Sequence, residues 1–513
     1  MSTQHLPTTA AKSSRFRSRH ATAVLFAALT AAGLSTSASA QTTFIKADNT
    51  NALNTSTVLG VNTYNVVGVP TSADTIQIDG TLTVNRSSAL GGNLTVAGIT
   101  YSATQNFQVN PTTGAALTIG SGGITKSGGA ALVLANAVTL GANQTWSIAT
   151  GTGNLQMNGS FSDGGNTLAV NGTGTFDLRG TNTFGSNVTI GAAIGINGGA
   201  TVTFGGTNTY DVLTVTSGRV QGATLNNFGV ASNFGDGGTN TAINLGGTSS
   251  SGVFEYTGNT ASSNRTFNMD RRSNGNSILV SNSATTLTLS GTILTSAGNT
   301  TSEKSVALTA GGAGNLVLSG VISDHAGAAF DTSLIKTGLG SVTLTKANTF
   351  AGGVSVTQGT LLVENTTGSG TGSGNVSVAS GAALGGDGII SGSVTFADGA
   401  SFVFNTSSIL DVTGSVNFIN FSISNVVGLD NSVGFGTYTL IDGSATISST
   451  GLANVGSSNA IDLGSGKSAF FDLTTGNLQV TVSAIPEPSA YAALAGLGIL
   501  GFAVSRRRSG RSS

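Results

Sequence analysis

The chain has 513 residues, of which 76 are glycine, and only 8% are charged; its formal net charge is −1. Glycine is about twice its usual share of roughly 7%, and charge is far below the usual quarter or so. The absence of cysteine excludes disulfide bonds and thiolate metal sites, and three histidines, two of them near the N-terminus, exclude a histidine-based metal cluster. Basic residues gather at the two ends, while residues 41–484 carry 20 acidic against 12 basic side chains, which argues against nucleic acid as a partner.

Residues 1–40 have the pattern of a secretory signal peptide. A basic stretch through Arg19 precedes an apolar run from Ala21 to Leu34. Small residues follow and end in Ala38-Ser39-Ala40. The apolar run is shorter than the roughly 20 residues that span a bilayer, which disfavours a transmembrane helix. We expect cleavage after Ala40, with Ala38 and Ala40 as the recognised small residues and Gln41 as the new N-terminus.

Residues 41–402 form a succession of short alternating segments separated by Gly, Asn, Ser and Asp. Examples are TLTV from Thr81, SVTL from Ser341 and VSV from Val354, and LQVTV from Leu478 continues the pattern later in the chain. Alternation with period two predicts β-strands, and the separators favour turns. The segments therefore predict an all-β fold.

The alternating segments also repeat one another. The stretch GTGTFDLRGTNTFGSNVTI from Gly172 aligns without a gap on GLGSVTLTKANTFAGGVSV from Gly338, and ATVTFGGTNTYDVLTV from Ala200 is a third copy. A repeat of this length cannot bury its apolar face alone, so successive copies must stack and pair their strands. We predict a right-handed parallel β-solenoid, also called a β-helix.

The best repeat, residues 334–363, resembles the autotransporter-associated β-strand repeat of bacterial passenger domains. The resemblance covers about 30 residues and weakens over 172–220. It rests on three short elements, whose signature residues are Lys336, Gly338, Gly340, Asn348, Thr349, Phe350, Gly359, Thr360 and Leu361. Autotransporters end in a translocating β-barrel, whereas this chain ends in a different kind of segment. The resemblance therefore implies the repeat fold and not the transport mechanism.

Residues 403–484 are less regular, and we interpret them as final β coils or a cap. An uncapped solenoid end exposes strand edges that promote aggregation.

Residues 485–513 form a tail with three parts. Pro486, Glu487 and Pro488 come first, an apolar run covers 490–504, and Arg506, Arg507 and Arg508 follow. Arginines stay on the cytoplasmic side of a membrane, so the body would lie on the outer face. This arrangement resembles the PEP-CTERM sorting signal. The resemblance implies that an exosortase-type peptidase removes the tail, which holds the chain only transiently in the inner membrane. A permanent single-span anchor is the alternative.

The densest charge cluster of the body is Arg265, Asp270, Arg271 and Arg272, with Glu255 upstream. A solvent-exposed turn with mutually paired charges is one interpretation, and a carbohydrate-binding or catalytic patch is the other. Glycosidases and lyases need clustered carboxylates and basic groups on one face. We expect neither catalysis nor a cofactor or metal.

These features together predict an exported structural or adhesive protein of the cell surface or extracellular matrix. Its expected partners are the secretion translocon, the sorting peptidase and an exopolysaccharide or other surface polymer. A polysaccharide-active β-helix enzyme and a permanently anchored surface protein are the competing hypotheses.

Overall fold

The structure is a computed structural model of the chain. It describes residues 41–58, 61–149, 153–180, 182–183, 188–190, 201–209, 212–238, 242–247, 250–269, 274–295, 306–324, 331–443, 446–474, 476–485, 496–497 and 499–500. The predicted signal peptide therefore lies outside the described residues. Most of the predicted sorting tail lies outside them as well.

Two long sheets, each with 15 described strands, run through the body, and their pairings are parallel. The first sheet contains β1 (Thr43–Ile45), β4 (Thr75–Ile78), β6 (Leu94–Tyr101), β8 (Ala116–Lys126), β10 (Ala137–Leu140), β11 (Gln144–Ile148), β13 (Phe161–Ser162), β14 (Leu168–Gly172), β16 (Asn182–Thr183), β17 (Val188–Ile190), β19 (Leu213–Val215), β21 (Ala242–Leu245), β24 (Thr266–Met269), β27 (Ile293–Thr295) and β30 (Ile322–Ser323). The second sheet contains β5 (Ser87–Ala89), β7 (Phe107–Asn110), β9 (Leu132–Leu134), β12 (Leu155–Met157), β15 (Thr175–Leu178), β18 (Thr201–Phe204), β20 (Gly218–Gly222), β22 (Gly252–Tyr256), β25 (Asn274–Val280), β28 (Val306–Gly312), β31 (Thr332–Thr337), β33 (Val354–Val356), β35 (Val376–Val378), β38 (Val394–Phe396) and β41 (Val416–Phe418).

A third sheet of eight described strands begins in the middle of the chain and is also parallel. It contains β23 (Ala261–Ser263), β26 (Thr286–Leu289), β29 (Asn315–Leu318), β32 (Ser341–Leu344), β34 (Gly359–Val363), β36 (Ala382–Gly386), β39 (Ser401–Val403) and β42 (Val426–Val427).

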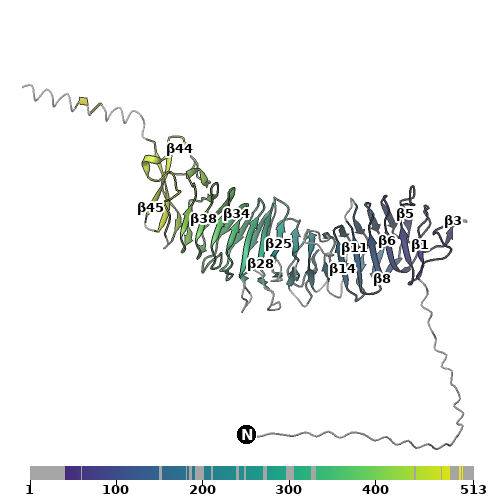
Figure 1. Cartoon of the computed structure of the whole chain (residues 1–513). Coiled ribbons are helices and arrows are strands. Elements are labelled where there is room, and N and C mark those ends of the chain that lie inside the picture. The colour runs from purple at the N-terminus through teal and green to yellow at the C-terminus, as the bar shows by residue number, and fades with distance from the viewer. Residues whose placement is uncertain are drawn as a thin grey trace, which may run out of the picture. The chain divides into compact units, whose positions relative to one another are not determined.

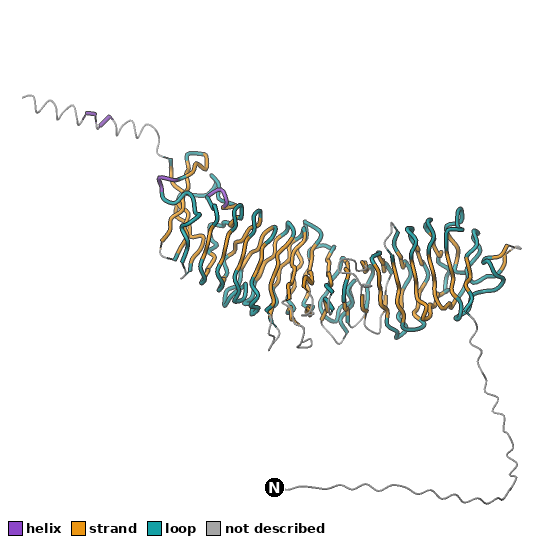
Figure 2. Tube along the Cα trace, viewed as in Figure 1, coloured by secondary structure: helices purple, strands orange, loops and turns teal. Residues whose placement is uncertain are grey.

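The chain passes from one sheet to the next and returns to each sheet one strand further along. For example, β28, β29 and β30 belong to the second, third and first sheets, and β31 then pairs with β28. Figure 1 shows the strands of the body stacked one after another. We call each such passage a coil. Side-chain hydrogen bonds between neighbouring coils, such as Asn315 to Ser341 and Asn375 to Ser393, join residues 26 and 18 positions apart. The coils are therefore short and of unequal length, with loops between the strands (Figure 2).

The core consists of inward side chains that stack from coil to coil. One column in the third sheet follows the strand register from β26 to β42, and its members are Leu287, Leu316, Val342, Leu361, Leu384, Phe402 and Val426. All seven are buried. Burying an aliphatic or phenyl side chain contributes about 1.5–3 kcal/mol. The strand alternation read from the sequence is thus an alternation between this core and the outer face.

The N-terminal end of the stack is closed by an antiparallel segment around the hairpin of β2 (Thr57–Val58) and β3 (Val61–Asn62). Ala47 donates its N–H to the Thr63 carbonyl, and Asn65 donates to that of Ile45, which covers the edge of β1. The prediction of a strand for the TLTV segment from Thr81 is wrong. The segment is a loop, because the Asp48 carboxylate accepts hydrogen bonds from the N–H groups of Thr83 and Asn85.

The C-terminal end is closed by a six-stranded sheet whose last four strands are antiparallel. It contains β37 (Ile389–Ile390), β40 (Leu410–Val412), β43 (Gly436–Asp442), β44 (Ile461–Gly464), β45 (Lys467–Thr474) and β46 (Asn477–Ala484). The short 3-10 helices η1 (Ile423–Asn425) and η2 (Ser457–Asn459) lie in the same region (Figure 2). Parallel coils continue beyond residue 402, and the antiparallel part begins at Gly436.

We expect Phe350→Ala to destabilise the body by about 3–5 kcal/mol, because the buried ring leaves a cavity between two coils. The exposed neighbour Thr349 is the control, and Thr349→Ala should change the free energy of unfolding by less than about 0.5 kcal/mol. Urea unfolding followed by circular dichroism measures both. Equal effects of the two substitutions would contradict this description of the core.

Candidate functional site

The glycines of the repeat signature lie where successive coils turn between the second and third sheets. Gly338 has φ +71°, and a Cβ there would lie 2.7 Å from the backbone nitrogen of Gly312 in the preceding coil. A Cβ at Gly340 would overlap the carbonyl oxygen of Gly314. Gly359, in the following coil, has φ +69° and approaches the carbonyls of Gly338 and Gly340 in the same way. Glycine is required here both for its backbone conformation and for the close approach.

Lys336 is the buried cation inside this turn. Its Nζ donates hydrogen bonds to the carbonyl oxygens of Thr337, Gly338 and Gln358, at 2.8, 2.7 and 2.8 Å. The side chain is fully buried, and burial lowers the pKa of Lys336 to about 8. Because Gln358 belongs to the next coil, the ammonium group joins the turns of two coils.

Lys46 and Lys126 are also buried lysines that bond to the carbonyls of a turn, and the sequence did not lead us to predict them. Lys126 is buried and donates to the Gly128 carbonyl at 2.7 Å; burial lowers its pKa as well. Lys46 donates to the carbonyls of Ala47 and Asn49, and burial lowers its pKa to about 8 against the opposing effect of the Asp48 charge. The available signal was a lysine at a strand end two residues before glycine, as in Lys126-Ser127-Gly128 and Lys336-Thr337-Gly338.

Asn348 links three coils through its amide. Its Oδ1 accepts the N–H of Ile322 at 2.8 Å, and its Nδ2 donates to the Gly370 carbonyl at 2.6 Å. Asn208, the matching residue of another copy, is also buried and donates to the Asn233 carbonyl. Phe350 and Leu361 point into the core, Thr349 is exposed, and Thr360 donates its N–H to Gly340. The signature residues therefore hold the turns and the core together.

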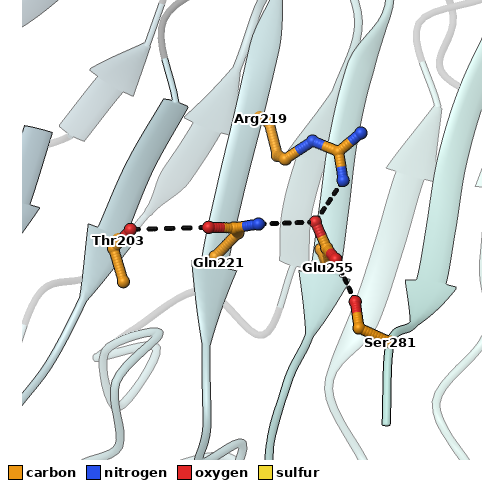
Figure 3. Close-up of polar contacts among 5 residues, drawn as sticks. All are labelled: Thr203, Arg219, Gln221, Glu255 and Ser281. Atoms are coloured by element: carbon orange, nitrogen blue, oxygen red, sulfur yellow. Dashed lines mark hydrogen bonds and ion pairs between the residues drawn. The ribbon is translucent and has the colours of Figure 1, made fainter. Parts of the chain in front are cut away.

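A polar row on the outer face of the second sheet is centred on Glu255 (Figure 3). Its carboxylate accepts hydrogen bonds from Gln221 Nε2 at 2.8 Å and from Arg219 and Ser281. Thr203, on the next strand, donates to Gln221 at 3.5 Å. Burial alone would raise the pKa of Glu255, but the hydrogen bonds from Gln221, Ser281 and Arg219 and the charge of Arg219 hold it below its ordinary value. Glu255 is thus a fixed anion.

The structure describes two members of the predicted charge cluster, Arg265 and Glu255, and these two do not pair with each other. Arg265 is fully buried, with its guanidinium donating to the carbonyls of Phe234 and Gly235, so it is not part of a solvent-exposed turn. Glu255 pairs with Arg219 from the preceding coil and not with Arg265. Closeness in the sequence did not predict this ion pair, because the strand register between coils determines which residues lie next to Glu255. Asp270, Arg271 and Arg272 lie outside the described residues.

The outer face of the second sheet towards the C-terminal end carries hydroxyl and amide side chains in register. One row consists of Ser355, Ser377, Thr395 and Asn417. In the adjacent row, Asn375 Oδ1 accepts the N–H of Ser393, and Ser393 Oγ accepts that of Ser415. Ser377 and Asn417 are exposed, and the other two members of the first row are partly exposed. This row presents uncharged hydrogen-bonding groups at the strand spacing of about 4.8 Å.

Two pairs of carboxylates lie on neighbouring coils near the C-terminal end. Burial raises the pKa of Glu364 and the charge of Asp387 adds to the effect, while burial and the charge of Asp442 do the same for Asp411. Within the described residues, no three histidine, aspartate or glutamate side chains come together as a metal site.

The folded body continues to Ile485, the residue before Pro486. β46 ends at Ala484, and the N–H of Ile485 donates to the Gly466 carbonyl at 2.8 Å. Lys467, opposite Ala484 in the register, donates to the carbonyls of Asn431 and Val433. Its Nζ also lies 5.3 Å from the centre of the Phe435 ring. We call Phe435, Lys467 and Ile485 the junction surface.

Most residues of the predicted cleavage site and sorting motif lie in segments that the structure does not describe. Ala38, Ala40, Pro486, Glu487, Pro488 and Arg506 to Arg508 lie outside the described residues. Gln41, the predicted new N-terminus, is exposed and its Nε2 donates to Thr75 Oγ1 at 2.7 Å. Among the residues that are described, no helix is sufficiently long and apolar to cross a membrane.

Comparison with protein families matches residues 484–508 to the PEP-CTERM protein-sorting motif. The match includes Pro486, Glu487, Pro488 and the three arginines. The motif implies processing by an exosortase and indicates export and sorting to the cell surface. Among curated proteins, none matches the chain significantly. The resemblance of residues 334–363 to the autotransporter-associated repeat stays a prediction.

We expect Gly359→Ala to destabilise the body more than Gly381→Ala. Both glycines have positive φ, +69° and +75°, which costs about 1–2 kcal/mol for alanine. A Cβ at Gly359 would also overlap the carbonyl oxygen of Gly338 and lie 2.6 Å from that of Gly340, whereas one at Gly381 meets no atom within 4 Å. The close approach should add about 1–3 kcal/mol. Urea unfolding of both variants measures the difference, and equal losses would refute the role assigned to the turn.

The buried lysines should make stability depend on alkaline pH. The folded-state pKa of Lys336 is about 8 and its ordinary value is 10.5, so the unfolded chain binds more protons between these values. The free energy of unfolding should therefore increase as the pH rises from about 8 to 10.5. Lys336→Met should lower stability, because three carbonyls lose their partner, and should also flatten this increase.

Lys346, an exposed lysine in the same repeat, provides the control for this pH dependence. Lys346→Met should keep the slope of the native sequence in denaturant midpoints measured from pH 7 to pH 10. An unchanged slope in Lys336→Met would show that the buried ammonium group does not titrate as described.

Proposed function

We propose that this protein is an exported structural and adhesive scaffold of the bacterial cell surface or extracellular matrix, built as a closed right-handed parallel β-solenoid. An exosortase-type peptidase sorts it through its C-terminal tail. The observation that carries the proposal is the combination of long parallel sheets with polar outer rows and a matched sorting motif that begins at the last residue of β46.

The closed solenoid is supported by the order in which the chain visits the sheets. In the three long sheets, strands pair in parallel with the strand one coil later, and inward columns run through many coils. Parallel strands in one sheet require a crossover, and such crossovers are right-handed in nearly all known cases. The 30-residue segment 334–363 supports the assignment to autotransporter-associated repeats, since its signature lysine and asparagine bond to neighbouring coils and its glycines allow the backbones of these coils to approach closely.

An adhesive role is supported by the outer rows of the second sheet. Hydroxyl and amide groups at regular spacing can bond to the hydroxyls of an extended polysaccharide, so an exopolysaccharide or similar surface polymer is the partner that we propose. Such a scaffold requires no catalytic centre. Glu255 supports this point, because its carboxylate is occupied by three donors and its pKa lies below the ordinary value, which is the opposite of a general acid.

The tail supports a transient stay in the inner membrane. The apolar run 490–504 would enter the bilayer with Arg506 to Arg508 on the cytoplasmic side, and cleavage near Pro486 to Pro488 would release the body outward. The secretion translocon would act first, through residues 1–40. A permanent anchor is the alternative, and it predicts a mature protein that still contains the arginines.

Replacing Pro486, Glu487 and Pro488 together by alanine should leave the tail attached, because the peptidase loses its recognition motif. The intact mass of the protein from its own host should then rise by the mass of the tail, and the protein should shift from the surface fraction to the membrane fraction. Ser489→Ala, next to the motif, is the control and should be processed normally. A native protein that already retains Arg506 to Arg508 would contradict the proposal.

Turnover on polysaccharides separates the scaffold from the enzyme hypothesis. We expect the native protein to bind to but not depolymerise a panel of neutral and acidic polysaccharides, assayed by reducing ends and by the absorbance of unsaturated lyase products. Cleavage by the native protein that is lost in Glu255→Gln or Asp270→Asn would establish an enzyme and overturn the scaffold role.

A further inference from the structure

We propose that the junction surface, formed by Phe435, Lys467 and Ile485, is a membrane-contact surface that rests on the lipid headgroups of the bilayer while the sorting tail is in place. This inference rests on the proposed membrane entry of the tail.

The length of chain between the folded body and the membrane carries the argument. Ile485 is the last residue of the body that the structure describes before the tail; it bonds to Gly466, and the apolar run begins at Ala490. Five residues span at most about 17 Å when fully extended. Two of the five are prolines, whose fixed φ restricts the conformations of this linker. Ile485 must therefore lie within about 17 Å of the hydrocarbon boundary, a distance that includes the headgroup layer, and Lys467 and Phe435 belong to the same end of the body.

The apolar side chains of the junction surface suit the boundary between lipid headgroups and acyl chains. Phe435 is 61% exposed and Ile485 is 37% exposed, although both are large and apolar. The transfer of aromatic and aliphatic side chains from water to this boundary is favourable.

Lys467 supplies the polar part of the contact. Its ammonium group has three donors, of which two bind the carbonyls of Asn431 and Val433. Its Nζ also lies 5.3 Å from the centre of the Phe435 ring, so a positive charge lies beside the ring that would enter the headgroup boundary. Asp430 lies close enough for its pKa to be lowered, mainly by the Ser432 hydroxyl and N–H and to a lesser degree by Lys467. Asp430, next to the junction surface, thus opposes the charge of Lys467, so we expect apolar insertion to dominate over attraction to anionic lipid.

The test uses the chain from Gln41 to Ser513, reconstituted into vesicles of phosphatidylcholine and phosphatidylglycerol with brominated acyl chains. Phe435→Trp places a reporter on the junction surface, and Ile485→Trp is a second reporter. Phe228→Trp is the matched control, since Phe228 is 38% exposed on a loop far from the tail in the sequence. The native Trp146 is fully buried and gives a constant background. We expect bromine quenching and a blue shift of emission for the two junction reporters, and neither effect for Phe228→Trp.

The outcomes distinguish a failure of the membrane entry of the tail from a failure of the junction surface. A chain that does not float with the vesicles in a density gradient would refute membrane entry of the tail. A chain that floats while Phe435→Trp and Ile485→Trp are quenched no more than Phe228→Trp would refute the junction surface alone. If Phe435→Ser instead blocks processing in the host without any quenching in vesicles, the surface serves the peptidase, and the lipid contact is wrong.

Discussion

Parallel pairing between each strand and the strand one coil later is the constraint on which the rest of the structure depends. It requires that backbones from different coils approach to about 4.8 Å at every turn as well as within the strands. The glycines of the signature meet this requirement, since a Cβ at Gly338 or Gly340 would overlap the backbone of the preceding coil. Turns this close also leave carbonyl groups buried, and buried polar groups must be bonded. Lys336 and Asn348 supply those bonds.

The same pairing leaves two edges that must be protected, and the chain closes both with antiparallel segments. At the N-terminal end the residues around Tyr64 cover β1, and at the C-terminal end β43 to β46 change the direction of pairing. Closed ends limit growth by edge-to-edge addition. An exported scaffold with this design would present its outer rows to a polymer without assembling through its own edges.

The strands were largely predictable from the sequence because alternation records the core directly. Ser341–Leu344 and Val354–Val356 are strands where the pattern placed them, and the copies from Gly172 and Gly338 have corresponding strands. The sequence did not show which sheet a copy joins: β15 belongs to the second sheet and β32 to the third. It also could not show that Glu255 meets Arg219, because these residues are neighbours through register alone. The Thr81 segment alternates without being a strand, since its side chains and backbone bind the N-terminal cap through Asp48.

Distances between spin labels along one outer row test the central claim most directly. The row runs in register from Val253 through Thr309 and Ile335 to Asn417. The chain contains no cysteine, so pairs of introduced cysteines can be labelled specifically. With one label at Asn417, stacked coils predict backbone separations of about 19 Å to Ile335, about 24 Å to Thr309 and about 34 Å to Val253. Distances that increase by one strand spacing per coil support the account, and distances unrelated to the number of intervening coils would contradict it.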